Sequence, residues 1–167
     1  LREVVVVAAV LCGGLGTRLR HVIGEHQKCC ADVGGRPWLH RVLDFLQAGG
    51  IERAILLTGY RAYEIGTAVG QWRTARQNDA VQMDIEYLHS EPSGTEKAVA
   101  LAFERTKEKT LLVLNGDTLV EGFDLAEFLA ICQRNGASMV VAGPNALNPE
   151  VFAESGLEYR VLGSGRN

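Results

Sequence analysis

The sequence predicts an α/β fold, a three-layer α/β/α Rossmann-like sandwich with a mostly parallel central sheet. Residues 4–11 are a continuous apolar run rich in valine, which is typical of a strand buried on both faces. Short apolar segments of this kind alternate with stretches whose apolar residues recur at helical spacing. Strands separated by helical patterns of about 10–15 residues indicate βαβ crossovers and hence a parallel sheet covered on both faces.

The predicted elements follow one another without a repeat or a low-complexity tract. Gly49-Gly50 ends the first long helix, where a left-handed residue is needed. Ser93 to Glu96 reads as a capping box for a later helix, and the last helix has Asp124 before it and Gly136 after it. The predicted strands are residues 4–11, 54–58, 83–88, 110–114 and 138–142, and the predicted helices are residues 37–47, 63–69, 98–105 and 125–133.

Length and composition fit one domain over residues 1–167, which is long enough to bury a substantial core. An apolar content of 47% with a net charge of only −3 excludes a disordered chain. The recognisable domain is expected to cover residues 1–142, and residues 143–167 form an unassigned tail. Both ends look cut, because the chain begins with Leu1 and stops after a polar segment.

Several classes of partner are not expected. The chain has no long Lys/Arg run of the kind that binds nucleic acid. The longest early apolar run stops at Gly13, well short of the roughly 20 residues that cross a bilayer, so no membrane partner is expected. No secretory signal is visible. The four cysteines lack C-x-x-C or zinc-ligand spacing, which favours reduced thiols in a cytoplasmic protein.

Two polar clusters come directly after predicted strands. Residues 13–20 follow the first strand, and Asn115-Gly116-Asp117 follows the fourth. In open parallel sheets, ligands bind outside the carboxyl ends of the strands, where the strand order switches direction. The sequence therefore predicts a functional site formed by these two clusters.

The glycine-rich loop has the chemistry of an anion site. Gly13, Gly14 and Gly16 let several backbone N–H groups approach a bound anion. The loop is not a Walker A motif, and it does not complete the dinucleotide fingerprint, whose third glycine would fall at Leu19. Arg18 adds positive charge, which suits a ligand with several phosphates. A plain strand-to-helix turn is the alternative explanation of these glycines.

This loop, with Lys28 and the segment Val33-Gly34-Gly35-Arg36-Pro37, resembles the signature of the sugar-1-phosphate nucleotidyltransferases. The segments 57–60, 91–95 and 114–117 follow in the family's order, and the match covers residues 3 to about 142. Within the family, the chain is most similar to the mannose- and D-glycero-D-manno-heptose-1-phosphate guanylyltransferase branch.

The resemblance implies condensation of a nucleoside triphosphate, with GTP favoured, and a sugar-1-phosphate to give an NDP-sugar and pyrophosphate. It implies that Arg18 and Lys28 are catalytic, on the leaving phosphates and the α-phosphate respectively, and that Asp117 holds Mg²⁺. Asn115 and Gly116 would contact the sugar substrate. The nucleotide-binding residues implied are Leu11, Gly13, Gly14, Gly16, Thr17, Arg18, Gly94 and Thr95.

Each of these residues also has an ordinary structural explanation. Asp117 could belong to an Asx turn, Lys28 could be a solvated surface lysine, and Ser93 to Glu96 could serve as a helix cap alone. Trp38 and Phe45, at helical spacing, are expected in the core. The order of the motifs and their places at strand ends together favour the site.

The chain also departs from the family pattern. Where the family has Pro-Lys-Pro, Gln27 and Cys29 flank the lysine, so the fixed φ of proline is missing. Glu96-Lys97 replaces small residues. No Glu-Lys motif for the sugar phosphate follows residue 142, and no second acidic Mg²⁺ ligand is recognisable.

Two functions therefore remain open, an active nucleotidyltransferase and a non-catalytic module that binds nucleotide or NDP-sugar. We expect the isolated chain to bind nucleotide but to turn over slowly or not at all. A glycosyltransferase of related topology is disfavoured, because Asp117-Thr118-Leu119 lacks its Asp-x-Asp pair.

Overall fold

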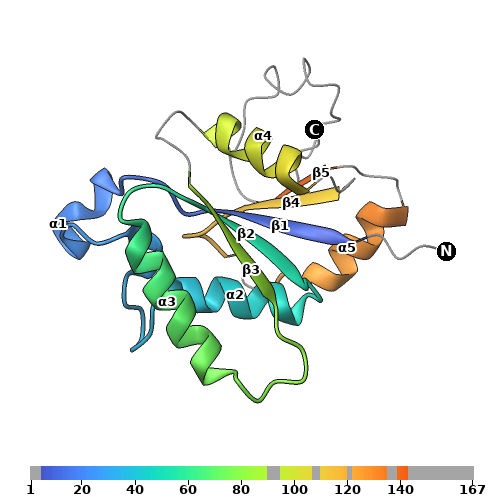
Figure 1. Ribbon diagram of the computed structural model, residues 1–167, viewed down its shortest axis with the longest axis horizontal. Coiled ribbons are helices and arrows are strands. Elements are labelled where there is room, and N and C mark those ends of the chain that lie inside the picture. Colours follow the sequence, from blue (N-terminus) through green and yellow to red (C-terminus); the bar gives the residue numbers. More distant parts are fainter. Residues whose placement is uncertain (1–4, 90–94, 107–109, 120–121, 135–138, 143–167) are drawn as a thin grey trace.

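The computed structural model describes residues 5–89, 95–106, 110–119, 122–134 and 139–142. Its strands form one parallel sheet in the order β3-β2-β1-β4-β5 (Figure 1). The predicted parallel α/β class is confirmed. The strands are β1 (Val6–Leu11), β2 (Arg53–Thr58), β3 (Asp84–His89), β4 (Thr110–Asn115) and β5 (Met139–Ala142).

The longer helices cover both faces of this sheet, which confirms the three-layer architecture (Figure 1). On one face lie α2 (Trp38–Ala48), α3 (Ala62–Ala75) and α5 (Leu125–Arg134), and on the other lies α4 (Thr95–Thr106). The connection from β1 to α2 holds the short helices η1 (Thr17–Leu19), α1 (Arg20–Ile23) and η2 (Lys28–Cys30). None of the helices in the described part of the chain is long and apolar enough to span a membrane.

Strand β1 lies in the centre of the sheet and is buried on both faces. Val7 and Ala9 pack into the core under α4, whereas Ala8 and Val10 pack into the core formed with α2, α3 and α5. All four side chains are fully buried. This double burial explains why the strand is a continuous apolar run rather than an alternating one.

Helix α3 is longer than the sequence predicts, because it continues to Ala75 instead of ending near Val69. Trp72, in the added turns, is 2% exposed, and its Nε1 donates to Asp44 Oδ1 on α2 at 2.8 Å. Asp44 also pairs with Arg36 and Arg76. The contacts of Asp44 with Trp72 and Arg76 hold the last turns of α3 against α2.

Most predicted helix boundaries are confirmed. Gly50 has a φ of 81°, the left-handed geometry expected after α2. The N–H of Glu127 donates to Asp124 Oδ1 at 2.9 Å, so Asp124 caps α5. Strand β3 lies one residue later than predicted, and α4 begins at Thr95 rather than Ala98. Ser93 of the predicted capping box and Gly136 lie outside the described residues.

The strand order places the two polar clusters at one point. From β1 the chain adds β2 and β3 on one side of the sheet, and then crosses to add β4 and β5 on the other. The switch point therefore lies between β1 and β4, where Leu11 is in register with Asn115. The glycine loop and the Asn115-Gly116-Asp117 segment both emerge here, as predicted.

Candidate functional site

The glycine loop is fixed between the carboxyl ends of β1 and β2. The N–H of Cys12 donates to the carbonyl oxygen of Leu57 at 2.9 Å, and the N–H of Tyr60 donates to that of Gly13 at 3.4 Å. Gly16 has a φ of 61°, and a Cβ built on it would lie 3.4 Å from the Cβ of Lys28. Glycine suits this position because the left-handed conformation disfavours other residues.

Lys28, from the connection between β1 and α2, meets Asp117, from the polar cluster after β4. Lys28 begins η2, Asp117 follows β4, and the Lys28 Nζ forms an ion pair with Asp117 Oδ2. Their side chains are 28% and 26% exposed. A pair this accessible contributes little to stability, and it leaves a cation and a carboxylate within reach of solvent.

Gly116 allows the chain after β4 to pack closely behind this ion pair. Its N–H donates to the carbonyl oxygen of Leu11 at 3.0 Å. A Cβ built on Gly116 would lie 2.7 Å from Cys12 Sγ, 2.9 Å from Cys29 Sγ and 3.0 Å from Leu11 O. No larger residue fits without displacing these neighbours.

Two buried cysteines lie at the base of the site. Cys12 and Cys29 are each 1% exposed, and all four cysteines of the chain are free. The hydrogen bond with Cys29, together with burial, raises the pKa of Cys12 well above its ordinary value. Burial raises the pKa of Cys30 to about 12. The Cys12 and Cys30 thiols are therefore protonated at neutral pH, and the buried cysteines pack as small apolar groups.

Gln27 is a site residue that the sequence analysis missed. It is 1% exposed, and its Nε2 lies 2.7 Å from Cys12 O, 3.0 Å from Tyr60 O and 3.3 Å from Gly14 O. Its Oε1 accepts from the N–H of Cys29 at 3.3 Å. One buried amide therefore connects the loops after β1 and β2 to η2. Its only signal in the sequence is its position directly before Lys28.

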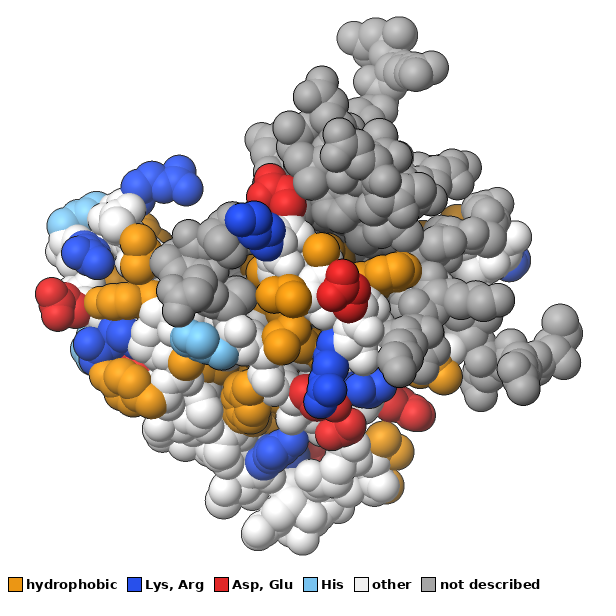
Figure 2. Space-filling view, turned by 45° about the horizontal axis from the view of Figure 1, so that its top comes forward, with side chains coloured by type: hydrophobic (Ala, Val, Ile, Leu, Met, Phe, Trp, Pro, Cys, Tyr) orange, Lys and Arg blue, Asp and Glu red, His pale blue; other side chains and the backbone are white. Residues whose placement is uncertain are grey.

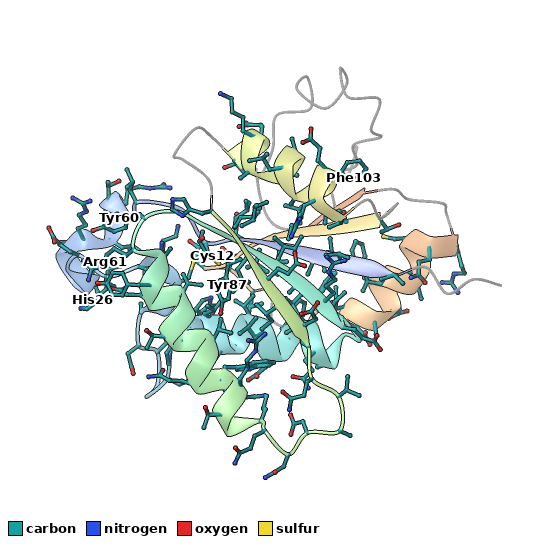
Figure 3. All side chains as sticks on the ribbon, viewed as in Figure 1. Cys12, His26, Tyr60, Arg61, Tyr87 and Phe103 are labelled. Atoms are coloured by element: carbon teal, nitrogen blue, oxygen red, sulfur yellow. The ribbon has the colours of Figure 1, made fainter. Side chains whose placement is uncertain are left out.

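Glu64, in the first turn of α3, anchors the same segment and was also missed. Its Oε2 accepts from the N–H of Gln27 at 2.7 Å, and its Oε1 accepts from Arg61 Nε at 2.5 Å and faces His26 Nδ1 at 3.4 Å. Figure 3 shows Arg61 and His26 side by side at the start of α3. Burial alone would raise the pKa of Glu64, but the hydrogen bonds from Gln27 and Arg61 lower it below its ordinary value.

Arg18 is placed differently from Lys28. It lies on η1 with its side chain exposed, and it forms no hydrogen bond or ion pair within the described part of the chain. Figure 2 shows Lys, Arg and His side chains gathered at the end of the molecule that carries η1 and α1. An exposed guanidinium beside a loop of backbone N–H groups is suited to bind phosphate.

The remaining predicted residues that the structure describes lie at the ends of strands or at the starts of helices. Leu11 and Asn115 end neighbouring strands and are half-buried, Thr95 begins α4, and Thr17 is exposed on η1. Gly94 lies outside the described residues. Among the described residues no group of three or more His, Cys, Asp or Glu side chains could hold a metal ion. Asp117 therefore belongs to no such group within the described part of the chain.

Comparison with protein families gives one match over most of the chain. The model of the MobA-like NTP transferase domain matches residues 8–160. This range includes the glycine loop, Lys28 and Asp117.

Curated relatives carry related names. D-glycero-alpha-D-manno-heptose 1-phosphate guanylyltransferase from Aneurinibacillus thermoaerophilus is 39% identical over 113 residues, which cover 67% of this chain and 46% of that protein. Mannose-1-phosphate guanylyltransferase from Mycobacterium tuberculosis is 33% identical over 146 residues, which cover 87% of this chain and 39% of that protein. The chain thus spans less than half the length of these relatives.

Solved structures agree with these matches. HddC from Yersinia pseudotuberculosis, in a crystal structure complexed with GMP-PN, is similar with a TM-score of 0.61 and 31% identity, over 75% of this chain and 53% of that chain. A UTP-bound UGPase from Acinetobacter baumannii has a TM-score of 0.64 over 80% of this chain and 54% of its own, and at 23% identity it supports the fold alone.

Proposed function

The chain belongs to the MobA-like NTP transferase family, and we propose that it forms the nucleotide-binding part of a sugar-1-phosphate nucleotidyltransferase. The reaction would join a nucleoside triphosphate and a sugar-1-phosphate, giving an NDP-sugar and pyrophosphate. The observation that carries this proposal is the meeting of Lys28 with Asp117 beside the glycine loop, at the switch point of the sheet. GTP is the triphosphate proposed, because the relatives at 39% and 33% identity are named guanylyltransferases.

The proposed roles follow from charge. An oxygen of the sugar phosphate attacks the α-phosphorus, and the bond to the pyrophosphate leaving group breaks. Such transfers depend on positioning and charge neutralisation more than on covalent chemistry. The loop amides at Gly14 and Gly16 would cradle the triphosphate, and the exposed fork of Arg18 would hold the β- and γ-phosphates. Lys28 would exchange Asp117 for the α-phosphate as negative charge develops there.

Asp117 suits a magnesium ion that is coordinated mainly by substrate phosphates and water. Mg²⁺ commonly takes one or two carboxylates and completes its octahedral shell with substrate phosphates and water. The partly exposed carboxylate of Asp117, beside the glycine loop, would meet that requirement as a protein ligand. When bound, the ion would neutralise phosphate charge. Asn115 and Gly116 would then line the sugar side.

A cytoplasmic location is part of the proposal. All four cysteines are free, and two of them are buried at the base of the site, a state of the thiols that a reducing compartment preserves.

Calorimetry with GTP, ATP, UTP and CTP, each with and without Mg²⁺, tests the proposal. GTP is expected to bind most tightly, and binding should weaken in Lys28→Ala. A panel of sugar-1-phosphates that includes the mannose and D-glycero-D-manno-heptose compounds is then added, with pyrophosphate release as the readout. Failure of every triphosphate to bind would refute the proposal.

Binding without pyrophosphate release would instead favour the module that binds nucleotide without catalysis. Rapid multiple turnover by the 167-residue chain would contradict the expectation that its acceptor part is incomplete. In that case acidic residues of the tail, residues 143–167, would be the candidates for the acceptor's binding site.

A further inference from the structure

We propose that Gln27 is a positioning residue that holds Lys28 against the glycine loop through its side-chain amide. This inference rests on the proposed function, because it concerns how the lysine reaches the triphosphate. Gln27 occupies the position at which the resemblance leads one to expect proline. Its amide would supply the rigidity that a proline ring supplies elsewhere.

The backbone at Gln27 has the geometry of a proline without the covalent restraint. Its φ is −67° and its ψ is 125°, whereas proline fixes φ near −65°. A glutamine leaves this angle free to change, so other contacts must hold it. The contacts described above do so, because the buried side chain is bonded at both its donor and its acceptor end.

These contacts hold the backbone on both sides of Lys28, at the residue before it and at the residue after it. Before the lysine, the N–H of Gln27 donates to Glu64 on α3. After it, the N–H of Cys29 donates to Gln27 Oε1, so that the Gln27 side chain caps the short helix that Lys28 begins. Lys28 Cα can therefore move little relative to α3.

The donor end of the amide connects the lysine to the phosphate-binding loop. Gln27 Nε2 reaches the carbonyl oxygens of Cys12 and Gly14, which belong to the glycine loop, and that of Tyr60 beside it. Orienting these carbonyls inward leaves the loop N–H groups available to an anion. The same amide thus fixes the distance between the two groups that would contact the triphosphate, and such support is what a precise site requires.

Gln47 provides a matched comparison. Its Nε2 makes one hydrogen bond, to Val81 O at 3.2 Å, and this contact at the end of α2 involves none of the site residues. Changing glutamine to methionine at either position removes the amide and keeps the side-chain length. Only the change at Gln27 alters the relationship between the lysine and the loop.

A double-mutant cycle on GTP binding tests the proposal, using Gln27→Met, Lys28→Ala and the double variant. If Gln27 acts by placing the lysine, Gln27→Met should weaken GTP binding about ten-fold in the parent but less than about two-fold in Lys28→Ala, since residues in one network couple on this scale. Gln47→Met combined with Lys28→Ala should be additive. Thermal unfolding without nucleotide verifies that each variant is folded.

If Gln27→Met lowers GTP affinity equally in the parent and in Lys28→Ala, the proposal is overturned, because Gln27 then acts on folding or on the loop alone. An unchanged affinity in Gln27→Met would also overturn it. If Gln27→Met does not fold, the cycle is run with Gln27→Asn, which stays polar but is one methylene too short to reach the carbonyls. If the parent binds no triphosphate, the proposed function fails and this inference fails with it, whereas parental binding with additive losses overturns this inference alone.

Discussion

The Lys28 ammonium is paired with the Asp117 carboxylate across the switch point between β1 and β4. The pair joins residues that are far apart in the sequence and leaves both side chains about one quarter exposed. A phosphate approaching Lys28 therefore meets a carboxylate already bound to it. Removing that carboxylate should have opposite effects with and without magnesium.

Asp117→Asn keeps the shape of the side chain and removes its charge. Without Mg²⁺, GTP should bind more tightly by about 1 kcal/mol, the scale of a partly exposed ion pair, because Lys28 is released and a repulsive charge is lost. Mg²⁺ is expected to tighten GTP binding by the parent protein, and this increase in affinity should be absent in Asp117→Asn. Calorimetry in EDTA and in excess Mg²⁺ measures both effects. Asp124→Asn is the matched control, because asparagine caps a helix as well as aspartate does.

Arg18→Ala should weaken triphosphate binding by about 1.5–3 kcal/mol, the scale of a hydrogen bond to a charged group. The side chain has no partner in the described part of the chain, so its loss should leave the unfolding midpoint unchanged. Arg134→Ala, at the other end of the domain on α5, should alter neither property. An Arg18→Ala variant that binds GTP like the parent would remove Arg18 from the site.

Gly116→Ala should lower the free energy of unfolding by about 1–3 kcal/mol, because the added methyl group overpacks a filled space. The displaced atoms are Cys12 Sγ, Cys29 Sγ and Leu11 O, so GTP binding should weaken as well. Gly66→Ala makes the same chemical change on α3, where nothing lies within 4 Å of the new Cβ. That control should raise the free energy of unfolding by about 0.5–1 kcal/mol, since alanine favours helix. Denaturant titrations of both variants decide the matter.

Glu64 should make the folded domain less stable as the pH falls into the acidic range. Its pKa is lower in the folded state than in the unfolded chain, so its contribution is present at neutral pH and is lost as the pH falls through the folded-state value. Glu64→Gln should therefore be less stable than the parent at pH 7. Between about pH 5 and pH 3, around and below the ordinary carboxyl pKa, the variant should lose less stability than the parent. Urea titrations of both proteins across this range give the free energy of unfolding at each pH. If it falls with pH equally in the parent and in Glu64→Gln, the lowered pKa of Glu64 is contradicted.

The sheet and most helix ends were predictable because their signals are local. The apolar run of β1 indicates burial on both faces, and Gly50 and Asp124 mark helix boundaries through their own backbone preferences. The meeting of the glycine loop with the Asn115-Gly116-Asp117 segment followed from motif position, since parallel strands end at a common edge, whereas the ion pair of Lys28 with Asp117 was not predicted. These features depend on neighbours in sequence or on topology alone.

The missed features depend on contacts between segments far apart in sequence. Nothing in the local pattern indicates that Gln27 is buried against carbonyl groups of two loops, or that Glu64 accepts its N–H. The last turns of α3 likewise depend on the hydrogen bond from Trp72 to Asp44 on another helix. Such networks are visible only once the fold is assembled.

The central place of β1 also bears on the order in which a nascent chain can fold. As the chain leaves the ribosome, β2 and β3 emerge before β4, so β1 can pair on one side while its other side still has open N–H and C=O groups. An open central strand of this apolar kind is prone to pair with other chains. Addition of β4 closes that edge and brings Asp117 to Lys28 in the same event. Pairing of the free side of β1 and the approach of Asp117 to Lys28 are thus expected to occur in one step, after which the open edge passes to β4 until β5 is added.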